Sequence, residues 1–144
     1  MRRGFTLLSA IFLMVLVATL MVLAFSLSTQ TAKQTGDIYL QEQGQLLARS
    51  ATEFALLAIS GHDNSANCIE QINLEYPQGS PIFDINMSLY YIGNGLPCNA
   101  GHLLDNTIAT QESNGTVLID TFVSYVDPGT EERVVFHRRT IQKP

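Results

Sequence analysis

Cysteine and histidine are the residue types with the most specific chemistry in this chain of 144 residues, and it holds few of them. The two cysteines are Cys68 and Cys98. In an oxidising compartment such a pair forms a disulfide, whereas in a reducing one it remains two free, buried thiols. On the chain-entropy account, closing a loop of about 30 residues would stabilise the fold by about 3–4 kcal/mol. The compartment therefore decides what these two residues do.

The three histidines do not form a catalytic or metal-binding pattern. His62, His102 and His137 are isolated in the sequence, without a cysteine or a carboxylate at the spacing of metal ligands. The sequence also lacks a Gly-x-Ser-x-Gly motif, a phosphate-binding loop and a cysteine with a candidate histidine base. We therefore expect solvated histidines on loops or strands, no metal or other cofactor, and no enzymatic activity.

The charge distribution argues against a nucleic-acid partner. The formal net charge is −5 at pH 7, and charged residues make up only 15% of the chain. The nearest approach to a basic patch is formed by Arg138, Arg139 and Lys143, which alternate with apolar residues. We interpret these cations as the solvent-facing side of an edge strand, because a nucleic-acid surface needs a clustered basic patch.

A long apolar run near the N-terminus indicates a membrane-spanning helix. The 23 residues from Phe5 to Leu27 contain no charge, and as a helix they would extend about 34 Å, enough for a hydrocarbon core of about 30 Å. The run is too long for the apolar core of a cleavable signal peptide. Arg2 and Arg3 precede it, so the positive-inside rule predicts a cytoplasmic N-terminus in the inner membrane. The rest would then lie in the periplasm, where Cys68 and Cys98 can oxidise.

The residues around Gly4 carry a more specific signal than a plain membrane anchor requires. Two arginines and this glycine lead directly into Phe5-Thr6-Leu7-Leu8. Over about the first 25 residues the arrangement resembles the N-terminal motif of type IV pilins and type II secretion pseudopilins. The resemblance implies that prepilin peptidase removes a leader of residues 1–4, cutting after Gly4, and that the new N-terminal Phe5 is methylated. The implied partners are other pilin or pseudopilin subunits, the peptidase, membrane lipid and an inner-membrane assembly platform.

One position departs from the family motif. The fifth residue after the expected cut is usually glutamate in this family, and here it is Ser9. A carboxylate is costly in a bilayer, but it can pair with the N-terminal ammonium of a neighbouring subunit. A serine offers only a hydroxyl to the preceding helical turn. Ser9 therefore favours a minor subunit over the major one.

Two functions follow from this region. The first is a minor pilin or pseudopilin, a structural subunit of a type IV pilus, a type II secretion system or a DNA-uptake filament. The sequence leaves open which machine it serves, and whether it sits at the tip or along the shaft. The alternative is an uncut, single-pass membrane-anchored periplasmic binding module.

A calcium site is the one metal site that the resemblance raises. Some major pseudopilins bind calcium in their C-terminal loops, and Asp105, Asp120 and Asp127 are the candidates here. No run of the type Asp-x-Asp-x-Asp is present, and a turn explains Asp127. We therefore expect no calcium site.

Helical periodicity continues beyond the membrane run. Residues 31–60 contain no proline, so one helix from residue 5 to residue 60 would be about 84 Å long, ending before Gly61. Ser, Thr and Gly dominate residues 26–36, where we expect a bend or local melting, the alternative being a continuous, slightly frayed helix. The apolar stripe of residues 39–58 is expected to cover a sheet; its members are Tyr39, Leu46, Leu47, Phe54, Leu57 and Ala58.

Two hairpins are expected after residue 61. Strands at residues 68–76 and 81–93 would flank a turn at residues 77–80, pairing Leu74 with Phe83 and Ile72 with Ile85.

The second hairpin turns at Asp127-Pro128-Gly129-Thr130. Its strands lie at residues 116–126 and 133–141, with Val126 opposite Arg133, and this register brings Asp120 opposite Arg139.

Together these elements predict an α+β, pilin-like fold. A long N-terminal helix, membrane-spanning in its first half, packs by its second half on a four-stranded antiparallel sheet. The expected organisation is a leader at 1–4, a transmembrane or filament-core helix at 5–27, an amphipathic continuation at 28–60 and a periplasmic β domain at 61–144.

Overall fold

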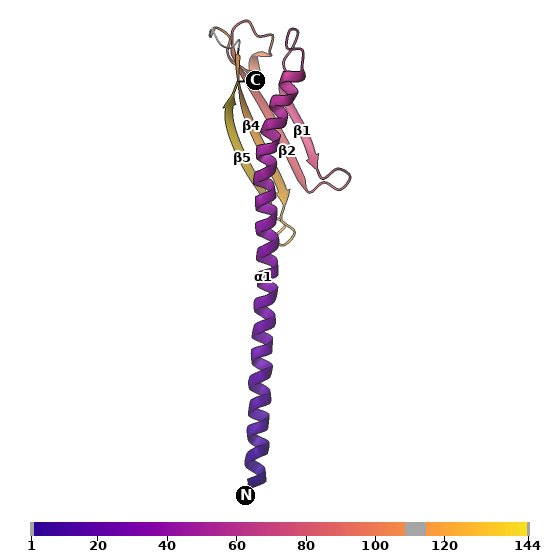
Figure 1. The fold of residues 1–144 in the computed structure, drawn as a ribbon, viewed down its shortest axis with the longest axis vertical. Helices are drawn as coiled ribbons and strands as arrows, with labels where there is room; N and C mark the ends of the chain where they lie inside the picture. Colours follow the sequence, from indigo (N-terminus) through magenta and orange to yellow (C-terminus); the bar gives the residue numbers. More distant parts are fainter. Residues whose placement is uncertain (1, 109–114, 144) are drawn as a thin grey trace. The chain divides into compact units, whose positions relative to one another are not determined.

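The computed structural model describes residues 2–108 and 115–143, and the side chains from residue 7 onward within them. The chain divides into two structural units, Met1–Tyr39 and Leu40–Pro144. Helix α1 (Arg2–Gly61) supplies the described part of the first unit and the first 22 residues of the second. The strands of the second unit follow it (Figure 1). An α+β fold with a long apolar N-terminal helix is therefore confirmed.

Helix α1 is continuous through residues 26–36, so the expected bend or local melting is wrong and the alternative is correct. The threonines of this stretch satisfy their hydroxyls within the helix. Thr29 Oγ1 donates to the carbonyls of Phe25 and Ser26, and Thr35 Oγ1 donates to the carbonyl of Thr31 at 2.9 Å. These bonds satisfy the threonine hydroxyls inside the helix, although threonine remains a weak helix former because its β-branched side chain loses χ1 freedom there.

Among the described residues the sheet has five strands, one more than expected. Their order is β1-β2-β4-β5, and β3 pairs with β2 outside this path. The bounds are β1 (Gln71–Tyr76), β2 (Phe83–Gly93), β3 (Leu103–Asp105), β4 (Gly115–Val126) and β5 (Arg133–Gln142), with a short 3-10 helix η1 (Ala100–His102) before β3. The other pairings are antiparallel, but β3 runs parallel to β2. A three-residue strand inside a Gly- and Asn-rich loop is too short to give a period-2 pattern.

The predicted register is correct for one hairpin and wrong for the other. In the β4–β5 hairpin, Val126 lies opposite Arg133 and Asp120 opposite Arg139, as predicted. In the β1–β2 hairpin the prediction is wrong by two residues, because Leu74 lies opposite Ile85. The predicted register would have placed Pro81, which has no backbone N–H, opposite Tyr76. Instead the N–H of Ile82 donates to the carbonyl of Tyr76 at 2.9 Å, and the loop is longer.

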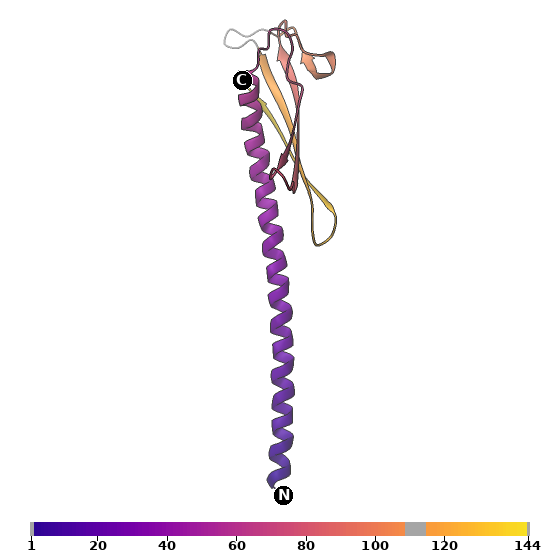
Figure 2. The ribbon, with the colours of Figure 1, turned by 90° about the vertical axis from the view of Figure 1, so that its right-hand side faces the viewer.

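The core of the second unit lies between one face of the sheet and residues 40–61 of α1 (Figure 2). The sheet contributes large side chains; those with almost no exposed surface are Phe83, Met87, Leu89, Val117, Ile119 and Val123. The helix contributes mostly small ones; its buried residues are Gly44, Ala48, Ala51, Thr52, Ala55 and Ile59. At Gly44 a Cβ atom would stand 2.5 Å from the ring of Phe136. The missing side chain therefore makes room for an aromatic ring of β5.

This packing corrects the expected helix face. Leu46, Phe54 and Leu57 are exposed, Leu57 by 70%, although the stripe was expected to cover the sheet. Leu47 is partly buried against the core. Small residues allow the helix to approach the sheet closely, and large side chains of the sheet fill the space between them. Size complementarity, rather than hydrophobicity of the helix residues, selects the buried face.

Candidate functional site

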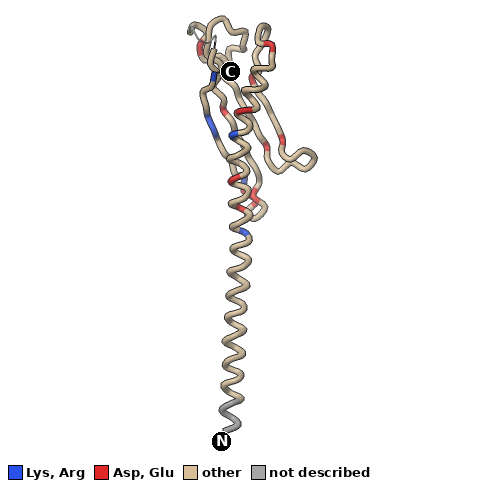
Figure 3. The backbone as a smooth tube through the Cα atoms, in the orientation of Figure 1, with Lys and Arg blue, Asp and Glu red and all other residues tan. Residues whose placement is uncertain are grey.

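The apolar surface of the first unit is the main candidate for a functional surface. Between residues 7 and 32 the chain carries no charged residue, and this stretch of the helix is tan in Figure 3, without the blue or red of charged residues. Its large apolar side chains are exposed, from 44% at Leu16 to 75% at Met14. By length and composition this helix could cross a membrane; its most apolar window has a mean hydropathy of 2.8 and no buried residue.

The threonine hydroxyls that the structure describes in this stretch are satisfied by the backbone of the helix itself. Thr19 Oγ1 donates to the carbonyl of Leu16 at 2.8 Å, and Thr31 Oγ1 donates to the carbonyl of Leu27 at 2.9 Å. In a hydrocarbon medium an unsatisfied hydroxyl is costly, so internal bonds of this kind suit a helix surrounded by lipid. The helix surface is thus apolar despite its threonines.

The residues of the N-terminal motif lie on α1. Gly4 and Phe5 fall within its bounds, but their side chains are outside the described residues. Ser9 lies on the exposed surface of the helix.

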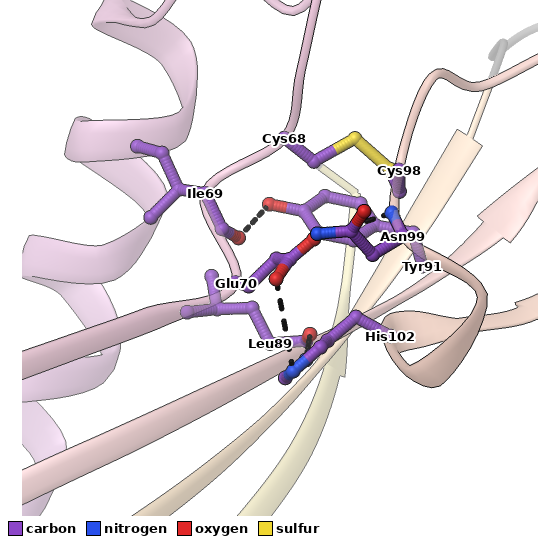
Figure 4. Close-up of polar contacts among 8 residues, drawn as sticks. All are labelled: Cys68, Ile69, Glu70, Leu89, Tyr91, Cys98, Asn99 and His102. Carbon is purple, nitrogen blue, oxygen red and sulfur yellow. Dashed lines mark hydrogen bonds and ion pairs between the residues drawn. A yellow bond between two sulfur atoms is a disulfide. The ribbon is translucent and has the colours of Figure 1, made fainter.

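The predicted disulfide between Cys68 and Cys98 is present, with a Cα–Cα distance of 5.0 Å. It joins the segment before β1 to the loop after β2 (Figure 4). The N–H of Asn99 donates to Glu70 Oε1 at 3.2 Å, and Tyr91 Oη donates to the carbonyl of Ile69 at 2.7 Å. The disulfide is therefore one of several contacts that hold this loop on the sheet.

Tyr91 is part of that cluster, and its phenol is held neutral. Burial, together with the nearby negative charge of Glu70, raises the pKa of Tyr91 to about 12. Its hydroxyl therefore acts as a hydrogen-bond donor over the physiological range.

His102 also belongs to the disulfide cluster and is not a freely solvated loop residue. Its Nδ1–H donates to the carbonyl of Leu89 at 2.9 Å, and its Nε2 lies 3.9 Å from Glu70 Oε2. The ring stacks on Tyr90 with a centroid distance of 5.2 Å. Sequence reasoning missed these partners because they come from β2 and from the segment before β1.

A second polar cluster lies on the sheet face away from the helix. Asp120 is 7% exposed in its side chain and accepts hydrogen bonds from His137 and Arg139. Burial alone would raise the pKa of Asp120, but the hydrogen bonds from Arg139 and His137 outweigh it and the pKa is lowered. The His137 ring stacks on Phe122 at a centroid distance of 4.4 Å. The Asp120–Arg139 pair was predicted, whereas the part played by His137 was not.

Neither cluster has the parts of a catalytic or metal centre. Among the residues that the structure describes, no serine, threonine or cysteine is hydrogen-bonded to His137, and no group of three metal-ligating side chains is present. The three candidate calcium ligands have separate roles. Asp127 accepts from the N–H groups of Gly129 and Thr130 in its turn, and Asp105 accepts from Thr107.

Comparison with known proteins adds no relative. No protein-family model matches this chain, and neither the curated proteins nor the solved structures contain a match.

Proposed function

We propose that this protein is a minor pilin or pseudopilin, a structural subunit of a type IV pilus, type II secretion or DNA-uptake filament. The observation that carries the proposal is the arrangement of two arginines, Gly4 and Phe5 directly before an uncharged helix. A plain membrane anchor needs the apolar helix but not the glycine beside it. The apolar, exposed surface of residues 7–27 supports the proposal, because subunits of this class assemble through such helices.

Maturation begins at the cytoplasmic side of the inner membrane. Prepilin peptidase removes residues 1–4 by cutting after Gly4, and the new N-terminal Phe5 is methylated. Removal of Arg2 and Arg3 deletes the cations at the cytoplasmic end of the helix, which favour its retention in the membrane. The helix is then held by its apolar surface alone.

Assembly transfers this helix from lipid into a bundle with the helices of other subunits. Lipid tails and a bundle of apolar helices are similarly apolar, so the transfer costs little hydrophobic free energy. Ser9 adds no charge pairing to this bundle, which fits a subunit present in few copies. The second unit lies in the periplasm, and the disulfide between Cys68 and Cys98 supports this placement because such bonds persist in oxidising compartments.

The mass of the mature protein tests the proposal. The protein would be purified from the inner membrane of a bacterium that expresses prepilin peptidase and analysed by mass spectrometry. The expected first residue is Phe5, carrying one added methyl group. An intact Met1, or any other first residue, contradicts the proposal.

A glycine substitution separates the proposal from the binding-module alternative. Gly4→Ala should accumulate the full-length precursor and abolish filament incorporation. Gly36→Ala is a matched control in the same helix, since nothing lies within 4 Å of an added Cβ there. If the wild type, Gly4→Ala and Gly36→Ala all keep the full-length mass and function alike, the chain is an uncut membrane-anchored binding module.

A further inference from the structure

Strand β5 forms one edge of the sheet (Figure 1). In its antiparallel ladder with β4, half of the backbone groups of β5 face away from β4. The N–H of Asp127 donates to the carbonyl of Glu132 at 2.9 Å, so these residues form a hydrogen-bonded pair at the end of the hairpin. Hydrogen-bonded pairs alternate along an antiparallel ladder. The residues of β5 with backbone groups directed away from β4 are therefore Arg133, Val135, His137, Arg139 and Ile141.

A basic groove lies beside this edge, within the second unit. It has a volume of about 290 Å³ and is lined by Gln45, Ala48, Arg49, Phe136, His137 and Arg138. Arg133 pairs with Asp84, and Arg139 pairs with Asp120. Arg49 and Arg138 have no carboxylate partner among the described residues. Two exposed guanidinium groups, one from the helix and one from the strand, thus line one groove, and neither forms a salt bridge among the described residues.

We propose that the β5 edge binds an extended, acidic segment of a partner protein by strand addition, with one of its carboxylates in the groove between Arg49 and Arg138. The backbone groups of β5 that face away from β4 supply the main-chain hydrogen bonds, as in other β-augmentation complexes. The two unpaired arginines supply the selectivity. This inference does not depend on the filament role.

Arg138 explains why the partner is acidic. A charged residue on the inner face of an edge strand discourages pairing with an apolar or basic strand. A carboxylate opposite Arg138 removes that penalty and gains a charge-assisted hydrogen bond. The same residue therefore excludes unsuitable strands and accepts an acidic one.

The register of β5 predicts the side-chain pattern of the partner segment. The residue opposite Arg138 points to the helix side and is Asp or Glu. Two positions away, opposite Phe136, an apolar residue continues the core. On the other face, the residue opposite Arg139 is acidic and those opposite Val135 and Ile141 are apolar, because both of these side chains are exposed.

Labelled synthetic peptides provide the test, with the full-length protein in detergent micelles. A short peptide that carries Glu opposite Arg138 and Arg139, and Val opposite Val135, Phe136 and Ile141, would be compared with peptides that carry Gln or Lys in place of Glu, by fluorescence anisotropy. We expect the Glu peptide to bind at least about tenfold more tightly than the Gln peptide at low ionic strength, and less so in high salt. A Glu peptide methylated at alternate backbone nitrogens should lose binding, since strand addition needs those N–H groups.

A charge-reversal variant completes the test. Arg138→Glu should weaken binding of the Glu peptide about tenfold or more and make the Lys peptide the better ligand. Lys33→Glu, in the first unit, makes the same change in net charge and should leave both affinities unchanged. Equal binding of the Glu and Gln peptides would overturn the proposal. So would an Arg138→Glu variant that still binds the Glu peptide more tightly than the Lys peptide. Self-association through the β1 edge of a second copy, without peptide binding, would overturn it as well.

Discussion

The two structural units use apolar residues in opposite ways. In the first unit the large apolar side chains of α1 are exposed and the helix has no sheet to cover. In the second unit the same helix buries small residues and leaves Leu46, Phe54 and Leu57 outside. The buried surface of the second unit is supplied mainly by the sheet. Hydrophobicity alone therefore does not say which helix residues form a core.

The two units therefore differ in how far they depend on their surroundings. The second unit has its own core and a disulfide, so its stability is set by internal contacts. The first unit has a large exposed apolar surface, of the kind that marks a membrane or protein–protein contact. Substitutions in the two units should accordingly affect different measurements.

The largest expected effect is in the core of the second unit. Leu89 has no exposed surface, and Leu89→Ala should lower the free energy of unfolding by about 2–5 kcal/mol because it leaves a cavity. Leu57→Ala, on the exposed side of the helix, should change it by less than about 0.5 kcal/mol. Urea unfolding of the full-length protein in micelles, followed by tyrosine circular dichroism, would measure both. Equal losses would show that the exposed leucine is part of the core.

Removal of the disulfide tests the second unit in another way. Replacing both Cys68 and Cys98 by serine should lower the free energy of unfolding by about 3–4 kcal/mol, since the unfolded chain gains loop entropy. The single-cysteine variants, which cannot form the bond either, serve as controls for the loss of each thiol. An unchanged unfolding midpoint would mean that Glu70, Tyr91 and His102 hold the loop without the bond.

A charge placed in the first unit should affect membrane insertion instead. Val17→Lys puts an ammonium group in the middle of the apolar helix, at a cost of about 2.5–3.5 kcal/mol in a bilayer. The fraction of protein that resists alkaline extraction from membranes should fall. Leu46→Lys introduces the same charge on the exposed helix surface of the second unit and should leave that fraction unchanged. Extraction of Val17→Lys at the wild-type level would contradict a membrane-spanning role for this helix.

The smallest expected effect concerns pH and the outer face of the sheet. The folded protein lowers the pKa of Asp120, so its ionised form contributes stability that is present above the ordinary pKa and is lost as the pH falls through the lowered value. Asp120→Asn should cost about 1 kcal/mol at neutral pH, because Arg139 is largely exposed, and should reduce the loss of stability in acid. Unfolding midpoints at neutral and acidic pH would measure this. If the variant loses as much stability in acid as the wild-type protein does, other carboxylates cause that loss.

The two hairpins differ in how well their registers could be predicted, although both connections have six residues, 77–82 and 127–132. The β4–β5 register was correct because Asp127 and Gly129 define a tight turn whose side-chain bonds appear in the structure. The β1–β2 register was wrong because residues 77–80 were expected to form the whole turn, whereas the connection extends to Ile82. The faces of the strands were still correct, because a shift of two residues preserves the alternation.

The candidate sites were predictable only where partners are close in sequence or directly opposite in a hairpin. The disulfide and the Asp120–Arg139 pair meet that condition. His102 does not, because its partners Leu89 and Glu70 come from separate segments. The buried helix face was also missed, since alanines give a weaker hydrophobic signal than leucines although they permit closer packing.

The threonines of α1 have a consequence for a helix that changes its surroundings. Thr19, Thr29, Thr31 and Thr35 each donate their hydroxyl to a carbonyl of the preceding turn. None of these hydrogen bonds depends on water, lipid or a neighbouring protein. The helix can therefore exchange one environment for another without breaking or replacing the hydrogen bonds of these four hydroxyls.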